Sequence, residues 1–153
     1  MDQKISFRFS DDYRDSANIH DELYTYNLSK TKAKRIEVYA DKYPEQFALL
    51  ACDETGTSYG GISFHWLNEP RHIFVDFFYL KDELRGKGIG KELFSVLISY
   101  AKENGAEKID LTTNTFQAPG FYQKIGFSIT GKEKQPFPGC PENIHYHLTL
   151  NLI

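Results

Sequence analysis

The sequence has little that would direct it to export, to a membrane or to metal binding. Cys52 and Cys140 are the only cysteines in its 153 residues, and two distant cysteines form neither a disulfide framework nor a zinc-binding pattern. No apolar run approaches the ~20 residues that span a bilayer, and the N-terminal residues 1–4 do not begin a signal peptide. We therefore expect a cytoplasmic protein that has no membrane span and holds no metal.

Positive charge is not in excess either. Lysine and arginine number 18 against 21 aspartate and glutamate residues, which gives a formal net charge of -3. Nucleic-acid-binding domains usually present a strongly basic face, so we expect no nucleic-acid partner. Aromatic residues, by contrast, are plentiful at 15% of the chain. Most should pack in the core of one domain covering residues 1–153, because this length suits a single core.

The hydrophobic pattern divides the chain into strands and helices. Period-two alternation and short apolar runs predict strands, whereas apolar residues three to four apart predict helices. Strands are expected at residues 5–9, 47–52, 58–66, 73–80, 108–113, 127–130 and 144–150. Helices are expected from a cap at Ser10 or Asp11 to about residue 27, over 89–104, and over 118–124. Residues 28–46 carry a small basic cluster, and they are either a solvated surface segment or one wall of a binding pocket.

These elements predict an α/β fold of the α+β kind, built on one mixed sheet. Turns at residues 53–56 and 68–70 join the early strands into an antiparallel meander. The helix over 89–104 then connects two strands, and a crossover of this kind makes those strands parallel. We expect six to seven strands flanked by about four helices.

A glycine-rich stretch stands where the meander ends and the second helix begins. A helix N-terminus leaves backbone N–H groups unpaired and carries partial positive charge, and glycines let a backbone approach an anion closely. The stretch therefore predicts a site for a phosphate or pyrophosphate group. It comprises Leu84, Arg85, Gly86, Lys87, Gly88, Ile89, Gly90 and Lys91.

Two well-known phosphate-binding patterns do not fit this stretch. A Walker A loop ends in Gly-Lys-Ser/Thr, but Lys91 is followed by Glu92, which has no hydroxyl for Mg²⁺. A dinucleotide-binding fingerprint needs Gly-x-Gly-x-x-Gly in the first strand–helix unit, whereas Gly86, Gly88 and Gly90 are spaced differently and follow an antiparallel meander. The pattern therefore favours neither an ATPase nor a dinucleotide-dependent enzyme.

The pattern that remains is Arg85-x-x-Gly88-x-Gly90, and with it the sequence resembles the GNAT superfamily of acyl-CoA-dependent N-acyltransferases. Residues 119–127, which read Pro-Gly-Phe-Tyr-Gln-Lys-Ile-Gly-Phe, are similar to a second motif of that family. The two motifs occur in the family's order, and the likeness extends from about residue 47 to the end of the chain. It implies a GNAT-like fold and an enzyme that takes an acetyl group from acetyl-CoA.

The resemblance also implies which residues bind acetyl-CoA. Its pyrophosphate would lie on the glycine-rich stretch, and its pantetheine arm would pair with the preceding strand like an added strand. Backbone N–H groups of that strand would stabilise the oxyanion formed at the thioester. The cofactor-binding residues so implied are Phe78, Tyr79, Leu80, Arg85, Gly86, Lys87, Gly88, Ile89, Gly90, Lys91, Asn114, Phe121 and Lys124.

Tyr122 is the candidate general acid for the transfer. It matches the tyrosine of the family's Phe-Tyr motif, which protonates the departing CoA thiolate. The alternative is that Tyr122 only packs in the core or contacts CoA.

Asp76 is the candidate base, or the anchor for the amine. It is the only charged residue in the strand predicted over 73–80, and a buried carboxylate is costly unless it is paired or functional. The alternative is a structural role, either a salt bridge to a neighbouring strand or a hydrogen bond to loop backbone. Strict alternation would place Asp76 on the same face of the strand as Phe78 and on the face opposite Phe77.

The sequence leaves the acceptor open between a small-molecule amine and a peptide amine. His65, His145 and His147 are weaker candidates for the base, because a hydrogen-bonded or exposed histidine is the commoner outcome. Family members are often dimers, so a homodimer is one open alternative. The competing function is an acyl-CoA-binding sensor that keeps the loop but has lost turnover.

Overall fold

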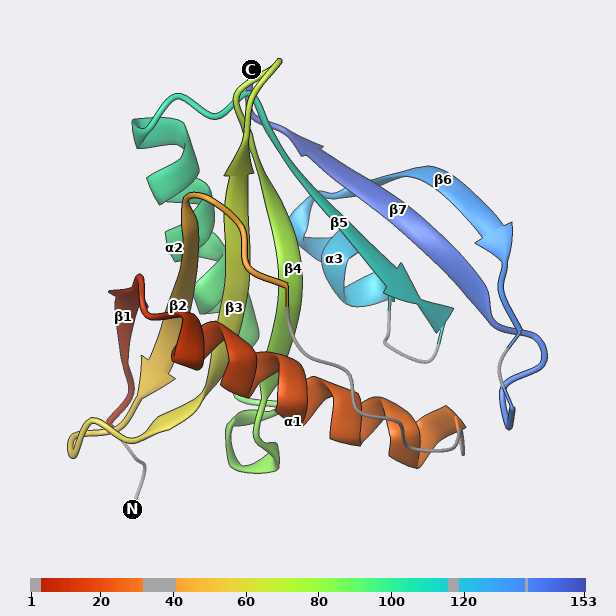
Figure 1. Cartoon of the computed structure of the whole chain (residues 1–153), viewed down its shortest axis with the longest axis horizontal. Coiled ribbons are helices and arrows are strands. Elements are labelled where there is room, and N and C mark those ends of the chain that lie inside the picture. The colour runs from red at the N-terminus through yellow and green to blue at the C-terminus, as the bar shows by residue number, and fades with distance from the viewer. Residues whose placement is uncertain (1–3, 32–40, 116–118, 137) are drawn as a thin grey trace.

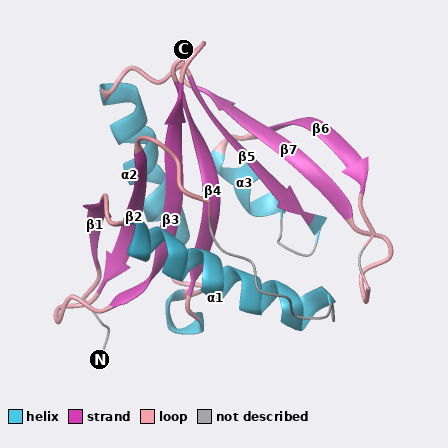
Figure 2. Ribbon diagram, in the orientation of Figure 1, coloured by secondary structure: helices cyan, strands magenta, loops and turns pink. Residues whose placement is uncertain are grey.

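A seven-stranded sheet runs through the molecule and carries helices on both faces (Figures 1 and 2). The computed structural model describes residues 4–31, 41–115, 119–136 and 138–153. The strands are β1 (Ser6–Ser10), β2 (Gln46–Cys52), β3 (Ser58–Leu67), β4 (His72–Leu80), β5 (Lys108–Asn114), β6 (Ser128–Lys134) and β7 (Ile144–Asn151). The helices are α1 (Tyr13–Thr31), the 3-10 helix η1 (Asp82–Leu84), α2 (Ile89–Glu103) and α3 (Pro119–Ile125).

Strand order follows chain order except at the end of the chain. The order is β1-β2-β3-β4-β5-β7-β6, with β4 and β5 parallel and every other neighbouring pair antiparallel. This confirms the predicted mixed sheet, the early meander and the crossover through α2. The described residues form three α-helices and η1, where the sequence predicted about four helices.

The two faces of the sheet bury different sets of apolar residues. On one face α1 contributes Ile19, which packs on Ala48 and Leu50 of β2. On the other face α2 contributes Leu93 and Phe94, both fully buried against the larger core of the sheet. Figure 1 shows α1 in front of the sheet and α2 behind it. The site described below lies at the end of the sheet where both layers meet β4.

The N-terminal helix starts later and runs longer than predicted. Asp12 Oδ1 accepts the backbone N–H of Arg14 at 2.9 Å, so Asp12 is the N-cap rather than either of the two residues before it. Ser10 acts indirectly, because its Oγ accepts the Asp12 N–H at 3.1 Å. α1 continues to Thr31. Most of the segment that the sequence left open, residues 32–40, lies outside the described residues.

Gly60 marks a close approach of β3 to β4. Its φ is +108°, and a Cβ at this position would lie 2.1 Å from the carbonyl oxygen of Tyr79. We expect Gly60→Ala to lower the free energy of unfolding by roughly 2 kcal/mol or more, because both the clash and the backbone strain act. Urea denaturation followed by circular dichroism measures this change.

Gly131→Ala is the matched control for that substitution. A Cβ at Gly131 in β6 would make an ordinary contact, 3.7 Å from Cβ of His147. Its free energy of unfolding should change by less than about 0.5 kcal/mol. Equal losses in the two variants would contradict the steric argument.

Candidate active site

A β-bulge in β4 sets the geometry of the site. Ser63 of β3 pairs with Phe77, and the next residue, Phe64, pairs with Val75, so Asp76 is the extra residue. Val75 packs in the core on the α2 side, whereas Phe77 packs on the α1 side. Asp76 bonds to His65, which lies between two residues that pack on the α2 side and therefore points to the α1 side.

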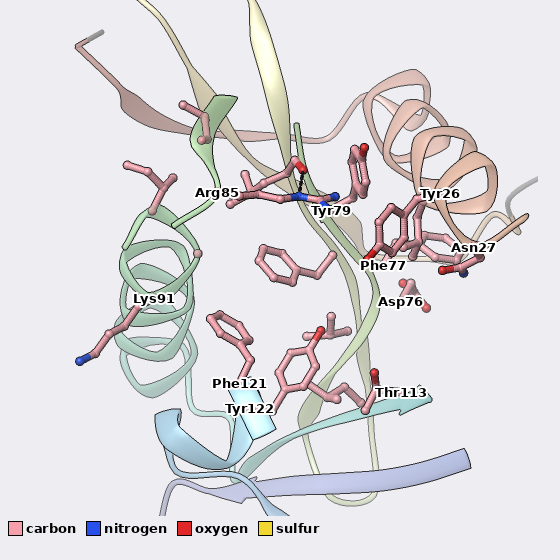
Figure 3. A pocket seen from close by; sticks show the side chains of 18 of the residues that line it. Tyr26, Asn27, Asp76, Phe77, Tyr79, Arg85, Lys91, Thr113, Phe121 and Tyr122 are labelled. Carbon is pink, nitrogen blue, oxygen red and sulfur yellow. Dashed lines mark hydrogen bonds between the residues drawn. The ribbon is translucent and has the colours of Figure 1, made fainter. Parts of the chain in front are cut away.

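The bulge corrects the predicted alternation along this strand. Asp76 shares the α1 side with Phe77 instead of sharing a face with Phe78 (Figure 3). The reason is that one extra residue shifts the side-chain period by one position. The acid therefore faces away from the α2 core, toward the wall formed by α1.

β4 and β5 separate just beyond this bulge. Their pairing covers only Ile73–Val75 with Ile109–Leu111, although β4 continues to Leu80. Within the described residues, the far half of β4 thus has one edge without a strand partner. The two strands and the elements around them enclose a cavity of about 600 Å³. An extended ligand could pair with that free edge as an added strand does.

The glycine-rich stretch closes one end of the cavity. Gly86 and Gly88 have φ of +74° and +80°, conformations that favour glycine. Gly88 is the N-cap of α2, and its carbonyl accepts the Glu92 N–H at 3.1 Å. The backbone N–H groups of the first turn of α2, before Glu92, therefore have no acceptor within the helix. Two residues of that turn, Ile89 and Gly90, line the cavity. This is the arrangement expected of an anion site.

Arg85 links the glycine-rich stretch to β4 and to α1. Its Nε donates to the carbonyl oxygen of Leu80 at 2.9 Å. The guanidinium carbon lies 4.7 Å from the ring centre of Tyr26 and 4.9 Å from that of Tyr79, so two aromatic faces hold the cation. Asp82 adds a partly exposed ion pair at 3.3 Å.

Tyr122 stands in a cage of phenylalanine rings. Phe78, Phe94, Phe121 and Phe127 have ring centres 5.3 to 6.4 Å from its own. Its hydroxyl points into the cavity (Figure 3). Burial raises the pKa of the Tyr122 phenol above its ordinary value of 10.0, so the hydroxyl keeps its proton at neutral pH.

Asp76 is the carboxylate of the cavity. Its Oδ2 lies 2.8 Å from Nδ1 of His65, and both side chains are almost fully buried. Burial raises the pKa of the Asp76 carboxyl, and the hydrogen bond from His65 opposes that rise. This bond to a neighbouring strand corresponds to the structural alternative for Asp76, but Asp76 also lines the cavity.

Most of the predicted site residues meet at this cavity. Lys87 and Lys124 are exposed and do not line it. Lys91 lines it, but Figure 3 shows its side chain pointing away, so its contribution is backbone. The predicted residues that do line the cavity are Asp76, Phe78, Tyr79, Leu80, Arg85, Gly86, Gly88, Ile89, Gly90, Lys91, Asn114, Phe121 and Tyr122.

The α1 wall is what the sequence did not reveal as part of the site. Leu23, Tyr26 and Asn27 line the cavity from α1, and Thr113 lines it from β5. Leu23 and Tyr26 belong to the apolar stripe of the predicted helix, which favours core packing. This spacing does not distinguish a cavity wall from the core, so the sequence carries no signal for the α1 wall.

A family model described as the acetyltransferase (GNAT) family matches residues 10–127. This chain belongs to the GNAT family. It is therefore an acetyltransferase, an enzyme of the acyltransferase class. The family assignment agrees with the glycine-rich stretch, the separated strands and the mixed sheet described above.

Three known proteins illustrate the family relationship. A curated relative, the blasticidin-S acetyltransferase of Streptomyces morookaense, is 32% identical over 135 residues, which cover 82% of this chain and 92% of the relative. The crystal structure of an acetyltransferase from Bacillus cereus is 27% identical, with a TM-score of 0.63 and coverage of 94% of this chain and 95% of the other. A proposed streptothricin acetyltransferase from Bacillus anthracis, solved with acetyl coenzyme A, has the same fold at 23% identity and a TM-score of 0.60, covering 78% and 70%.

The described part of the GNAT chain carries neither a membrane-spanning helix nor a cluster of metal ligands. Among the described residues, no helix combines the length and the hydropathy that a bilayer span requires. Within the same ranges, no group of three or more His, Cys, Asp or Glu side chains is placed to hold a metal ion.

Gly90 is the position where the loop and the aromatic wall meet. A Cβ there would lie 3.0 Å from Cζ of Phe78 and 3.1 Å from Cζ of Phe121, two rings that stack on each other. We expect Gly90→Ala to displace one ring and to raise the KM for the acyl-CoA donor roughly tenfold, because overpacking shifts the cavity wall. Steady-state kinetics with varied donor measures the effect.

The control for the Gly90 variant is Gly120→Ala in α3. A Cβ at Gly120 would meet nothing within 4 Å, although the residue is the neighbour of Phe121. This variant should keep the wild-type KM. A donor KM that rises equally in both variants would rule out the ring contact as the cause.

Proposed function

We propose that this GNAT enzyme transfers an acetyl group from acetyl-CoA to a primary amine by direct attack of the amine on the thioester. The observation that carries the proposal is that Tyr122 and Asp76 border one cavity whose wall is the free edge of β4 and whose end is the glycine-rich stretch. One cavity thus brings together a phosphate site, a backbone edge that can pair with an added strand, a proton donor and a proton acceptor.

The donor would lie along β4. Its pyrophosphate binds the first-turn N–H groups of α2, where helix geometry leaves donors unpaired. The pantetheine arm pairs with the free edge between Asp76 and Leu80. A backbone N–H of this stretch donates to the thioester oxygen and stabilises the oxyanion as the amine attacks.

The two protein side chains would handle the protons. A substrate ammonium has a pKa near 10 and must lose a proton before it attacks; Asp76 accepts that proton. The amine nitrogen then bonds to the carbonyl carbon, and the C–S bond breaks as the oxyanion collapses. Tyr122 gives its proton to the departing sulfur and regains one from the acetylated nitrogen through solvent. One proton is released for each acetyl group transferred.

The acceptor would enter from the α1 side of the cavity. Tyr26, Asn27 and Phe77 line that side around Asp76, so an amine attached to a flat or apolar group would fit there. Because one relative is named for blasticidin S, an acceptor panel should contain that compound beside simple amines and lysine peptides. The panel distinguishes a small-molecule acceptor from a peptide acceptor.

Tyr122→Phe tests the role of the general acid. Removing one oxygen from a caged ring should leave acetyl-CoA binding unchanged and lower kcat by roughly 100-fold or more, since the thiolate loses its proton donor. Calorimetric titration with acetyl-CoA and a thiol-release assay with the acceptor panel measure the two quantities.

Tyr100→Phe is the matched control for that variant. Tyr100 lies on α2 outside the cavity lining, where its hydroxyl accepts a hydrogen bond from Trp66 Nε1 at 3.1 Å. It should lose stability but keep kcat. If Tyr122→Phe turned over as fast as wild type, the general-acid role would be wrong. Acetyl-CoA binding with no turnover on any amine would instead contradict the proposed transfer.

A further inference from the structure

A buried histidine holds the carboxylate that borders the cavity. His65 Nδ1 and Asp76 Oδ2 are 2.8 Å apart, and the two side chains are only 7% and 6% exposed. A carboxylate accepts hydrogen bonds, so the N–H of His65 donates. A pair so completely removed from water is costly to bury, and one that also borders a cavity is a candidate for function.

Two aromatic rings pack against the ring of His65. Tyr43 stacks on it with ring centres 3.8 Å apart and planes 7° from parallel. Phe74, its direct partner across the strands, lies at 5.7 Å. Asp76 follows Phe74 by two positions on β4, so alternation places its side chain on the face that Phe74 and His65 occupy. The imidazole therefore has a fixed orientation toward the carboxylate.

His65 uses only one oxygen of the carboxylate. Oδ1 of Asp76 has no hydrogen-bond partner among the described residues, and it is not a fully buried atom. Asp76 lines the cavity near Tyr26 and Phe77 of the same wall (Figure 3). An ionised oxygen beside aromatic faces is a recognition site for an ammonium group, which both kinds of neighbour attract.

We propose that His65 is a positioning residue that keeps Asp76 ionised and directs its Oδ1 at the acceptor, so that the site selects amines that arrive as ammonium cations. The inference rests on the proposed acetyl transfer and specifies its acceptor class. The ammonium donates a hydrogen bond to Oδ1, gives it one proton, and attacks as the neutral amine. His65 holds its own proton on Nδ1 throughout.

The surroundings explain why such a residue is needed. Burial raises the pKa of Asp76, and Asp41 raises it further, whereas the hydrogen bond and charge of His65 lower it. Among the described residues, Tyr43 stacks on His65. The other titratable side chains that line the cavity are Tyr26, Tyr79, Arg85, Lys91 and Tyr122. The β5 residues that line the cavity, Leu111 to Asn114, are uncharged. Among the described residues, His65 is thus the group that favours the ionised acid.

The first experiment reads the carboxylate directly and needs no known acceptor. Carbon-13 NMR of the aspartate carboxyl groups is followed against pH, and Asp76→Asn identifies the Asp76 signal. We expect His65→Leu to raise the titration midpoint of Asp76 by about one pH unit or more, the size of a hydrogen bond to a charge. His65→Asn should restore most of the shift, because its amide places a donor near the Nδ1 position.

The second experiment reads the reaction. Activity requires ionised Asp76, so kcat/KM falls as pH drops through its pKa, and this acid limb should move to higher pH in His65→Leu. The KM for the amine should rise while the affinity for acetyl-CoA stays the same. His72→Leu is the matched control, since it removes another buried histidine of the sheet, bonded at 2.6 Å to the Pro70 carbonyl and outside the cavity lining.

A third measurement tests charge selection. Butylammonium should shift the Asp76 carboxyl signal, and neutral butanol, of similar shape, should not. The proposal is wrong if His65→Leu, shown to be folded by its amide spectrum, leaves the Asp76 midpoint and the acid limb where wild type has them. It is also wrong if butanol acts like butylammonium. Failure of wild type to bind acetyl-CoA or to acetylate any amine would instead overturn the proposed function, while the NMR titration would still decide the role of His65.

Discussion

One extra residue in β4 determines the layout of the site. Alternation along β4 up to Val75 places Asp76 on the α1 side, where it bonds to His65, and the bulge places the next residue, Phe77, on that side as well. The pairing of β4 with β5 also ends at Val75. The irregularity in the hydrogen-bond ladder thus lies where a carboxylate and a free backbone edge meet.

The two faces of the sheet divide the work of the site. On the α2 side, the start of the helix supplies unpaired backbone N–H groups, and the phenylalanine rings around Phe94 bury Tyr122. On the α1 side, Tyr26 and Phe77 border the carboxylate. In the proposed reaction, the α2 side would serve phosphate and thioester chemistry. The α1 side would serve the acceptor, and its side chains are those that would differ between enzymes with different amines.

Much of this could be predicted from the sequence, and the reasons are physical. The glycines around Gly88 allow a backbone conformation that few other residues adopt, so the loop can be identified from the sequence. The strands and α2 follow from hydrophobic periodicity. The bulge could not be predicted, because it depends on how Ser63 and Phe64 of β3 pair with β4. The sequence pattern of a single strand does not determine its pairing register. The bond between His65 and Asp76 could not be predicted for the same reason, because it also depends on the pairing register.

The N-cap of α1 was missed for a related reason. Ser10, Asp11 and Asp12 are all competent caps, and the choice among them depends on where β1 ends and how the chain turns. The α1 wall was missed because Tyr26 has the spacing of a core residue. Its position in the cavity lining and the contact of its ring with Arg85 indicate another role.

That contact bears on how tightly the enzyme can hold its donor. Arg85 is bonded to the Leu80 carbonyl and lies against two tyrosine rings, so contacts within the protein hold the start of the glycine-rich stretch. A loop already ordered loses little conformational entropy when a pyrophosphate binds, and more of the contact energy then appears as affinity. The arginine of the signature would thus act as much through preorganisation as through charge.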